Sequence, residues 1–126
     1  MQILLLGCTG FIGKALIQKL LINNNDITIV SRKELRKFSE NDSKQRIQYI
    51  YTDPSKQKSW QLDELIDALK KSEGVINLAG EPIADKRWTK EHIKKIEESR
   101  INTTKYLVEA MNELKRPPKV LINASA

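Results

Sequence analysis

Three glycines stand three positions apart near the N-terminus, in the run Gly7-Cys8-Thr9-Gly10-Phe11-Ile12-Gly13. An almost continuous apolar run, residues 2–6, comes directly before them and is typical of a central strand buried on both faces. Helical spacing follows to about Asn23, and its sheet-facing side is expected to carry Ile12, Ala15, Leu16 and Leu20. The glycine run therefore predicts a strand–turn–helix unit that opens an α/β fold.

The rest of the chain continues this alternation. Further strands are expected at residues 27–30, 47–51, 75–78 and 119–123, and further helices at residues 63–71 and from about 89 to 114. Residues 31–46 are polar, which favours a loop or a short helix. Five strands with helical crossovers predict one Rossmann-type domain over residues 1–126, with a right-handed, doubly wound parallel sheet. Because the chain stops just past the fifth strand, we expect a domain truncated within its ligand site.

Composition excludes several classes of protein. No apolar run approaches the roughly 20 residues of a membrane span, so no membrane partner is expected. The single cysteine, Cys8, excludes an internal disulfide and fits a reducing cytoplasm. The formal net charge of +6 suggests a nucleic-acid partner, but the excess is spread evenly between residues 1–80 and 81–126. The densest basic stretch, residues 32–46, has Phe38 as its only aromatic, so no nucleic-acid partner is expected.

The glycine run has a chemical use as well as a structural one. Gly7 permits the turn out of the strand, Gly10 lets a pyrophosphate approach the backbone, and Gly13 lets the helix pack on the sheet. The free N–H groups of the helix N-terminus favour an anion. We therefore expect a dinucleotide to bind, rather than a purely structural turn, at Gly7, Thr9, Gly10, Phe11, Ile12 and Gly13. A P-loop is excluded, since no Gly-Lys-Ser/Thr closes the turn.

The end of the second strand bears on which dinucleotide is bound. NAD enzymes usually place an Asp or Glu there for the ribose hydroxyls, whereas this chain has Ser31, Arg32 and Lys33. A guanidinium pairs with a 2′-phosphate and a serine hydroxyl donates to it, so we expect NADP in preference to NAD. The alternative is that Arg32 and Lys33 are solvated loop charges.

Two further strand ends are candidate parts of the site. Asp53 follows the third strand, where it either reaches the adenine edge or forms a plain Asp-Pro turn. Leu78, Ala79 and Gly80 end the fourth strand, and their small side chains let a dinucleotide lie against the backbone.

The long helix expected from about residue 89 carries a charge within its apolar stripe. One face is expected to hold Ile93, Ile96, Arg100, Thr104, Leu107, Met111 and Leu114. An unpaired charge on such a stripe is costly, so we expect Arg100 to face a phosphate or a carboxylate, and we expect it among the cofactor-binding residues. The alternatives are that Arg100 extends to the helix edge or pairs with Glu97. Trp88 is expected to pack, and His92 to be solvated.

The chain resembles a known family in the glycine run, Ser31-Arg32, residues 75–83, Arg87-Trp88, Ser99-Arg100 and residues 121–126. It is similar to the atypical short-chain dehydrogenase/reductases, and within them to the epimerase family 39 subgroup, also described as NAD-dependent epimerase/dehydratase-like or cell-division inhibitor-like. The Asn-Leu-Ala-Gly-Glu-Pro-Ile and Arg-Trp blocks are specific to this subgroup. The resemblance implies an NADP-binding Rossmann fold, oxidoreductase or epimerase activity, and a full-length protein more than twice as long.

Enzymes of this class use a tyrosine, a lysine four residues later and a serine after the fifth strand. Four positions after Tyr49, Tyr51 and Tyr106 stand Asp53, Ser55 and Ala110, so the tyrosine–lysine pair is missing. Ser125 matches the family's serine, unless the alignment shifts by one and Ala126 takes its place. We therefore expect dinucleotide binding without catalysis, in a truncated enzyme or in a non-catalytic nucleotide-sensing or partner-binding module. We also expect exposed apolar surface and self-association.

Overall fold

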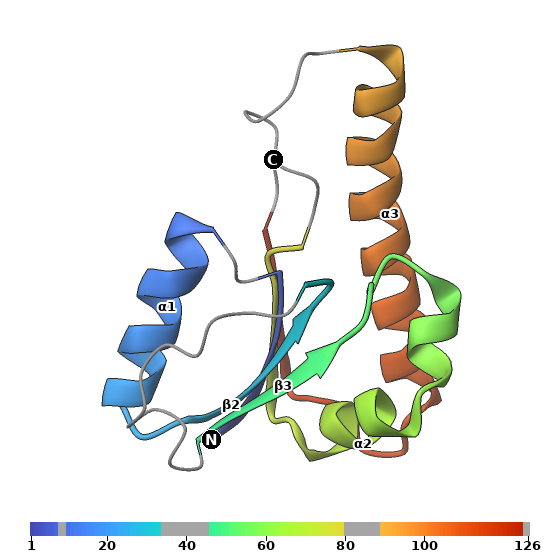
Figure 1. Ribbon diagram of the computed structural model, residues 1–126. Helices are drawn as coiled ribbons and strands as arrows, with labels where there is room; N and C mark the ends of the chain where they lie inside the picture. The colour runs from blue at the N-terminus through green and yellow to red at the C-terminus, as the bar shows by residue number, and fades with distance from the viewer. Residues whose placement is uncertain (8–9, 34–45, 80–88, 125–126) are drawn as a thin grey trace.

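The computed structural model describes residues 1–7, 10–33, 46–79 and 89–124. Five strands form one parallel sheet in the order β3-β2-β1-β4-β5 (Figure 1). The strands are β1 (Gln2–Leu6), β2 (Asp26–Ser31), β3 (Ile47–Tyr51), β4 (Gly74–Asn77) and β5 (Val120–Asn123). The helices are α1 (Phe11–Ile22), α2 (Asp63–Lys71) and α3 (Lys90–Glu113), with a short 3₁₀ helix η1 (Gln57–Gln61) that was not predicted. The doubly wound parallel sheet is confirmed.

Helices cover both faces of the sheet (Figure 1). Helix α1 packs on one face, where Ile3 and Leu5 of β1 meet Ile17. Helices α2 and α3 pack on the other face, where Leu4 and Leu6 join the cluster around Leu107. Successive side chains of a strand point to opposite faces, so a central strand with helices on both sides must be apolar throughout. This requirement explains the continuous apolar run of β1.

The face of α1 that meets the sheet differs from the predicted one. Ile12 is 71% exposed and Ala15 is also exposed, whereas Gly13 and Ile17 are buried. Leu16 and Leu20 pack against the core as partly buried side chains, as predicted. The helix turns Gly13 toward the sheet because a residue without a side chain allows the closest approach of the two backbones. The prediction for Ile12 and Ala15 was therefore wrong.

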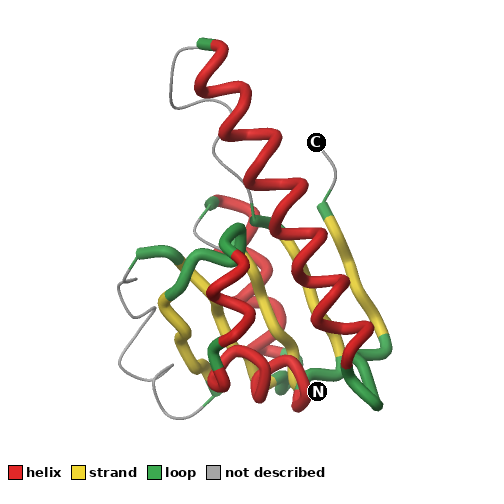
Figure 2. The backbone as a smooth tube through the Cα atoms, turned by 90° about the vertical axis from the view of Figure 1, so that its right-hand side faces the viewer, coloured by secondary structure: helices red, strands yellow, loops and turns green. Residues whose placement is uncertain are grey.

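Helix α3 extends well past the sheet. It runs opposite to the strands, and Thr104 meets Asn77 and Asn123 at the last residues of β4 and β5. The 14 helical residues before Thr104 are about 20 Å long at the usual rise of an α-helix. Figures 1 and 2 show this part of α3 projecting past the carboxyl edge of the sheet. We call residues 90–103 the overhang of α3.

The buried stripe of α3 is shifted from the predicted one. It holds His92, Ile96, Thr103, Leu107 and Ala110. Ile93 is 37% exposed, whereas His92, which was expected to be solvated, is only 6% exposed. Small or polar residues such as Thr103 and Ala110 carry little hydrophobic signal, so a pattern of large apolar residues places the stripe one position away. No helix in the described part of the chain is long and apolar enough to cross a membrane.

Candidate functional site

The strand order places a topological switch point between β1 and β4. The chain leaves β1 toward β2 and β3 on one side, then returns to β4 and β5 on the other. Ligands of open α/β sheets bind outside the carboxyl ends of the strands at such a point. Gly7 directly follows β1, and Leu78 and Ala79 directly follow β4. The structure thus brings together two groups of predicted site residues that lie 70 positions apart in the sequence.

Gly7 is required by the close approach of these two strand ends. Its φ of 73° lies in the left-handed region, and a Cβ there would come within 2.4 Å of the Ala79 Cα. The neighbouring backbone is held by a hydrogen bond from the Leu78 N–H to the Leu6 carbonyl, 2.8 Å. Any side chain at Gly7 would push the ends of β1 and β4 apart. The tight turn predicted for Gly7 is confirmed.

Gly10 marks an open site at the start of α1. It is the N-cap residue, and an added Cβ would meet no described atom within 4 Å. Among the described residues, no side chain caps the first turn of α1, and that turn holds no acidic residue. Phe11 and Ile12 beside it are 91% and 71% exposed. The amide donors and positive dipole end of α1 therefore lie free of described side chains, which fits a phosphate group. Thr9 lies outside the described residues.

The turn after β2 presents the predicted 2′-phosphate residues. Ser31 is 5% exposed, and its hydroxyl donates to the Lys33 carbonyl at 2.8 Å and accepts from the Lys33 N–H at 3.3 Å. Arg32, between them, is exposed. Ser31 therefore shapes the turn that holds Arg32 at the surface, a role that the sequence analysis did not assign to it.

Asp53 builds the turn that follows β3. Its Oδ1 accepts hydrogen bonds from the Ser55 backbone N–H at 3.0 Å and from the Ser55 hydroxyl at 2.7 Å. The Asp53 carbonyl accepts a further bond from the Ser59 hydroxyl. These contacts agree with the turn alternative. A contact between Asp53 and adenine stays a prediction.

An amide cluster at the ends of β4 and β5 was missed in the sequence analysis. Asn77 is 4% exposed, and its Nδ2 donates to the Asn123 Oδ1 at 2.7 Å and to the Thr104 hydroxyl at 3.4 Å. Its Oδ1 accepts from the Ala79 N–H at 3.0 Å. The two asparagines are register partners at the last position of adjacent parallel strands, a pattern that was available from the sequence. This cluster ties β4, β5 and α3 together beside the switch point.

Arg100 lies in the overhang of α3, one turn before Thr104. Its side chain is half-buried, and its Nε is buried without a hydrogen-bond partner. The ion pair with Glu97 considered above is not found among the described residues, where Lys94 and Glu98 form the surface pair of this helix. Gly80, Trp88 and Ser125 lie outside the described residues, so the structure does not place them.

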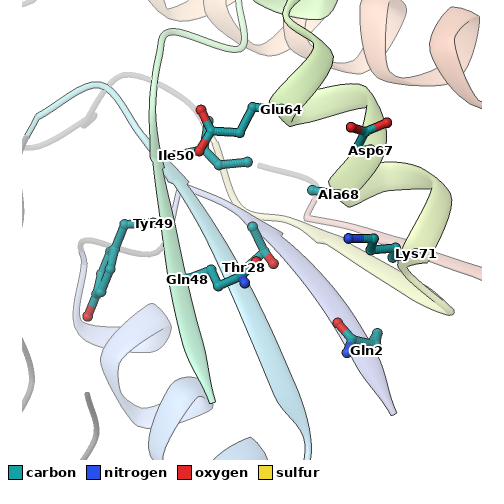
Figure 3. A pocket seen from close by; sticks show the side chains of 9 residues that line it. All are labelled: Gln2, Thr28, Gln48, Tyr49, Ile50, Glu64, Asp67, Ala68 and Lys71. Atoms are coloured by element: carbon teal, nitrogen blue, oxygen red, sulfur yellow. The ribbon is translucent and has the colours of Figure 1, made fainter. Parts of the chain in front are cut away.

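A cavity in the described part of the chain lies elsewhere. It has a volume of about 490 Å³ and opens between α2 and the first three strands, lined by residues that include Gln2, Gln48, Glu64, Asp67 and Lys71 (Figure 3). Gln2 and Gln48 stand near the amino ends of their strands, away from the glycine turn. None of the predicted site residues lines this cavity.

In the described ranges, no three His, Cys, Asp or Glu side chains come close enough to hold a metal ion.

A parallel sheet of order β3-β2-β1-β4-β5 with a glycine turn at its switch point defines a Rossmann-type α/β domain. The chain belongs to the NAD dependent epimerase/dehydratase family, whose model matches residues 3–126. An epimerase family protein of Staphylococcus haemolyticus is 34% identical over 125 residues, covering 99% of this chain and 37% of that protein. A chloroplastic homologue of SDR39U1 in Arabidopsis thaliana is 31% identical, over 100% of this chain and 34% of that protein. The chain thus spans little more than a third of these relatives.

Solved structures show the same fold. Human epimerase family protein SDR39U1, isoform 2, crystallised with NADPH, has a TM-score of 0.70 and 32% identity over 98% of this chain and 36% of that one. A uronate dehydrogenase variant from Agrobacterium tumefaciens in complex with NAD also has a TM-score of 0.70, over 98% of this chain and 40% of that one. Its identity is 15%, so this likeness concerns the fold alone.

Proposed function

We propose that this chain is the NADP-binding portion of an oxidoreductase or epimerase of this family. The observation that carries the proposal is the start of α1: a helix N-terminus at the switch point that no described side chain caps, with no described atom within 4 Å of a Cβ at Gly10. The human relative, which was crystallised with NADPH, supports the same cofactor. When bound, this cofactor supplies hydride transfer, and the residues of the chain hold and orient it.

The proposed contacts follow the carboxyl edge of the sheet. The amides at the start of α1 bind the pyrophosphate, and the exposed Arg32 binds the 2′-phosphate on the turn that Ser31 shapes. Asp53 lies at the adenine side, and the backbone after β4 packs against the dinucleotide. The full proposed set is Gly7, Thr9, Gly10, Phe11, Ile12, Gly13, Ser31, Arg32, Asp53, Leu78, Ala79 and Gly80. Arg100 was also predicted to bind the cofactor, but we assign it instead to a second ligand, as argued below.

Titration with NADPH and NADH tests the cofactor. The chain is expected to bind NADPH more tightly than NADH. Arg32→Ala is expected to weaken NADPH binding by about 30-fold, since a charge-assisted contact contributes about 2 kcal/mol, and to leave NADH binding unchanged. Isothermal titration calorimetry gives both constants. Arg46→Ala is the matched control, because Arg46 is exposed and bonded to Asn24 at the opposite edge of the sheet. Equal affinities for the two cofactors would contradict the NADP preference.

The missing tyrosine–lysine pair leaves two forms of the proposal, part of an enzyme or a non-catalytic module. The 126 residues hold no Tyr-x-x-x-Lys, so we infer that the chain by itself binds a dinucleotide without turning over a substrate. The alternative is a non-catalytic nucleotide-sensing or partner-binding module. The coding sequence downstream of codon 126 distinguishes the two. An open frame with Tyr-x-x-x-Lys supports the enzyme, and a stop codon without any remnant of the pair supports the module.

We propose further that the chain self-associates through β5. This edge strand leaves Val120 and Ile122 52% and 55% exposed. They are register partners of Gly74 and Ile76, and Ile76 packs on the α1 side of the sheet. The Val120→Thr, Ile122→Thr double variant keeps β-branched residues and is expected to reduce the average mass toward that of the monomer in sedimentation experiments. Val108→Thr, on the exposed side of α3, is the control. Unchanged association of the double variant would contradict the assignment to β5.

A further inference from the structure

Two buried side-chain nitrogens in the described part of the chain lack hydrogen-bond partners, and both lie in the overhang of α3. They are the His92 Nε2 and the Arg100 Nε. Eight residues separate them, which is about 12 Å along the helix axis, so one small ligand cannot satisfy both. Buried polar atoms are almost always hydrogen-bonded, and one that is not requires an explanation. Arg100 is the more informative of the two, because Thr104, one turn away on the same helix, is bonded to polar groups of two strands, β4 and β5.

Arg100 lies directly above the amide cluster. Thr104, one turn further along α3, contacts Asn123 at 3.4 Å, and Asn123 in turn accepts from Asn77 at 2.7 Å. Residues four apart on a helix share a face, so the side chains of Arg100 and Thr104 are neighbours. Asn77 and Asn123 end β4 and β5, and they therefore lie on the β5 side of the switch point. The start of α1 lies on the opposite face of the sheet from α3 (Figure 1).

The polar groups gathered here are mostly donors. The guanidinium of Arg100 has only donors. Both hydrogen bonds at the Asn123 side chain use its Oδ1, so the amide nitrogen of this exposed residue donates to no described residue. No described carboxylate pairs with Arg100. A guanidinium with a neighbouring amide donor suits a carboxylate or a phosphate, which accepts two parallel hydrogen bonds from arginine.

The geometry points to an anion site at Arg100 and Asn123, beside Thr104, that binds the acidic group, carboxylate or phosphate, of the second ligand rather than the dinucleotide. This inference rests on the proposed function, since a second ligand implies an enzyme that acts on a substrate beside the cofactor. The site lies at the carboxyl ends of β4 and β5, on the β5 side of the β1–β4 switch point. Arg100 is thus a specificity-determining residue for an acidic substrate.

Phosphate and acetate, titrated separately into the ¹⁵N-labelled chain at constant ionic strength, test the site. Each is expected to shift the Arg100 Nε–H, the Thr104 amide and the Asn123 side-chain amide in a saturable way. The shifts are expected to persist when the chain is saturated with NADPH, while shifts at Gly10–Gly13 caused by phosphate disappear. Arg100→Gln is expected to lower the affinity for both anions, measured from the shifts of Thr104 and Asn123, by at least about tenfold. It is expected to lower the affinity for NADPH by no more than about twofold. The exposed Arg116→Gln is the control and is expected to change neither.

Thermal unfolding separates a binding role from a structural one. Arg100→Met keeps the alkyl packing and removes the unpartnered nitrogen, so the Tm of the ligand-free chain is expected to stay equal or rise. A Tm several degrees lower, phosphate binding to Arg100→Gln at wild-type affinity, or displacement of phosphate from Arg100 by NADPH would each overturn the inference. If NADPH does not bind at all, the proposed function fails, whereas the titrations of the ligand-free chain still decide the anion site.

Discussion

Gly7→Ala is expected to lower the free energy of unfolding by about 3 kcal/mol, since left-handed backbone costs an alanine about 1–2 kcal/mol and overpacking adds a similar amount. The φ of Gly7 is 73°, and the new Cβ would lie 2.4 Å from the Ala79 Cα and 2.6 Å from the Ala79 nitrogen. Both contacts are with backbone, which cannot move aside as a side chain can. Denaturant titration followed by circular dichroism measures the loss.

Gly10→Ala is the matched control for this variant. Gly10 has a φ of −83°, which any residue adopts, and its Cβ would meet no described atom within 4 Å. Its free energy of unfolding is expected to change by no more than about 1 kcal/mol, the scale of N-cap effects. Its NADPH affinity, in contrast, is expected to fall by at least about tenfold, because the added methyl group occupies the space of the pyrophosphate.

The pair of variants thus separates two uses of glycine within one motif. Gly7 serves the contact between strand ends, and Gly10 serves the ligand. A Gly7→Ala chain as stable as the wild type would show that the ends of β1 and β4 do not approach as described. A stable Gly10→Ala chain that binds NADPH normally would contradict the dinucleotide site at α1.

Leu107→Ala is expected to destabilise the chain by about 3 kcal/mol, within the range for a leucine removed from a packed core. Leu107 is fully buried, in one cluster with Leu4, Val75 and Trp60. It belongs to the half of α3 that packs on the sheet. The overhang projects past the carboxyl edge of the sheet, so the half that holds Leu107 supplies the packing of α3 on the sheet itself. Urea denaturation gives the change in the free energy of unfolding.

Ile101→Ala is the control in the overhang. Ile101 is 63% exposed, so its truncation is expected to change the free energy of unfolding by less than about 0.5 kcal/mol. If Ile101→Ala costs as much as Leu107→Ala, the overhang contributes to the core, and the division of α3 into an anchored and a projecting half is wrong.

Several local features follow from the sequence with little ambiguity. The strand bounds agree with the predicted ones to within one residue, and β1 and β3 agree fully. The α2 bounds Asp63–Lys71 are also those predicted. These segments are short apolar runs or periodic helices with clear ends, and the burial of alternate faces requires such patterns. Where the apolar pattern is strong, the local sequence and the tertiary packing favour the same strand or helix with the same bounds.

The helix faces are less well predicted. Gly13 in α1 and Thr103 and Ala110 in α3 are buried although none is a large apolar residue. A small residue lets the helix pack closely on the sheet because it has little or no side chain. A pattern of large apolar residues does not detect such a position. The same limit applies to His92, a polar residue that is only 6% exposed.

The sequence by itself determined the α/β alternation, the glycine turn between β1 and α1, and the replacement of the expected acidic residue by Ser31 and Arg32. Each of these is a matter of residue type and spacing along the chain. Only the tertiary structure decided that Gly7 meets Ala79, that no described atom lies close to a Cβ at Gly10, and that Arg100 lies one helical turn from the contacts of Thr104 with Asn77 and Asn123. These contacts join residues far apart in sequence, and strand order, register and the length of α3 bring them together.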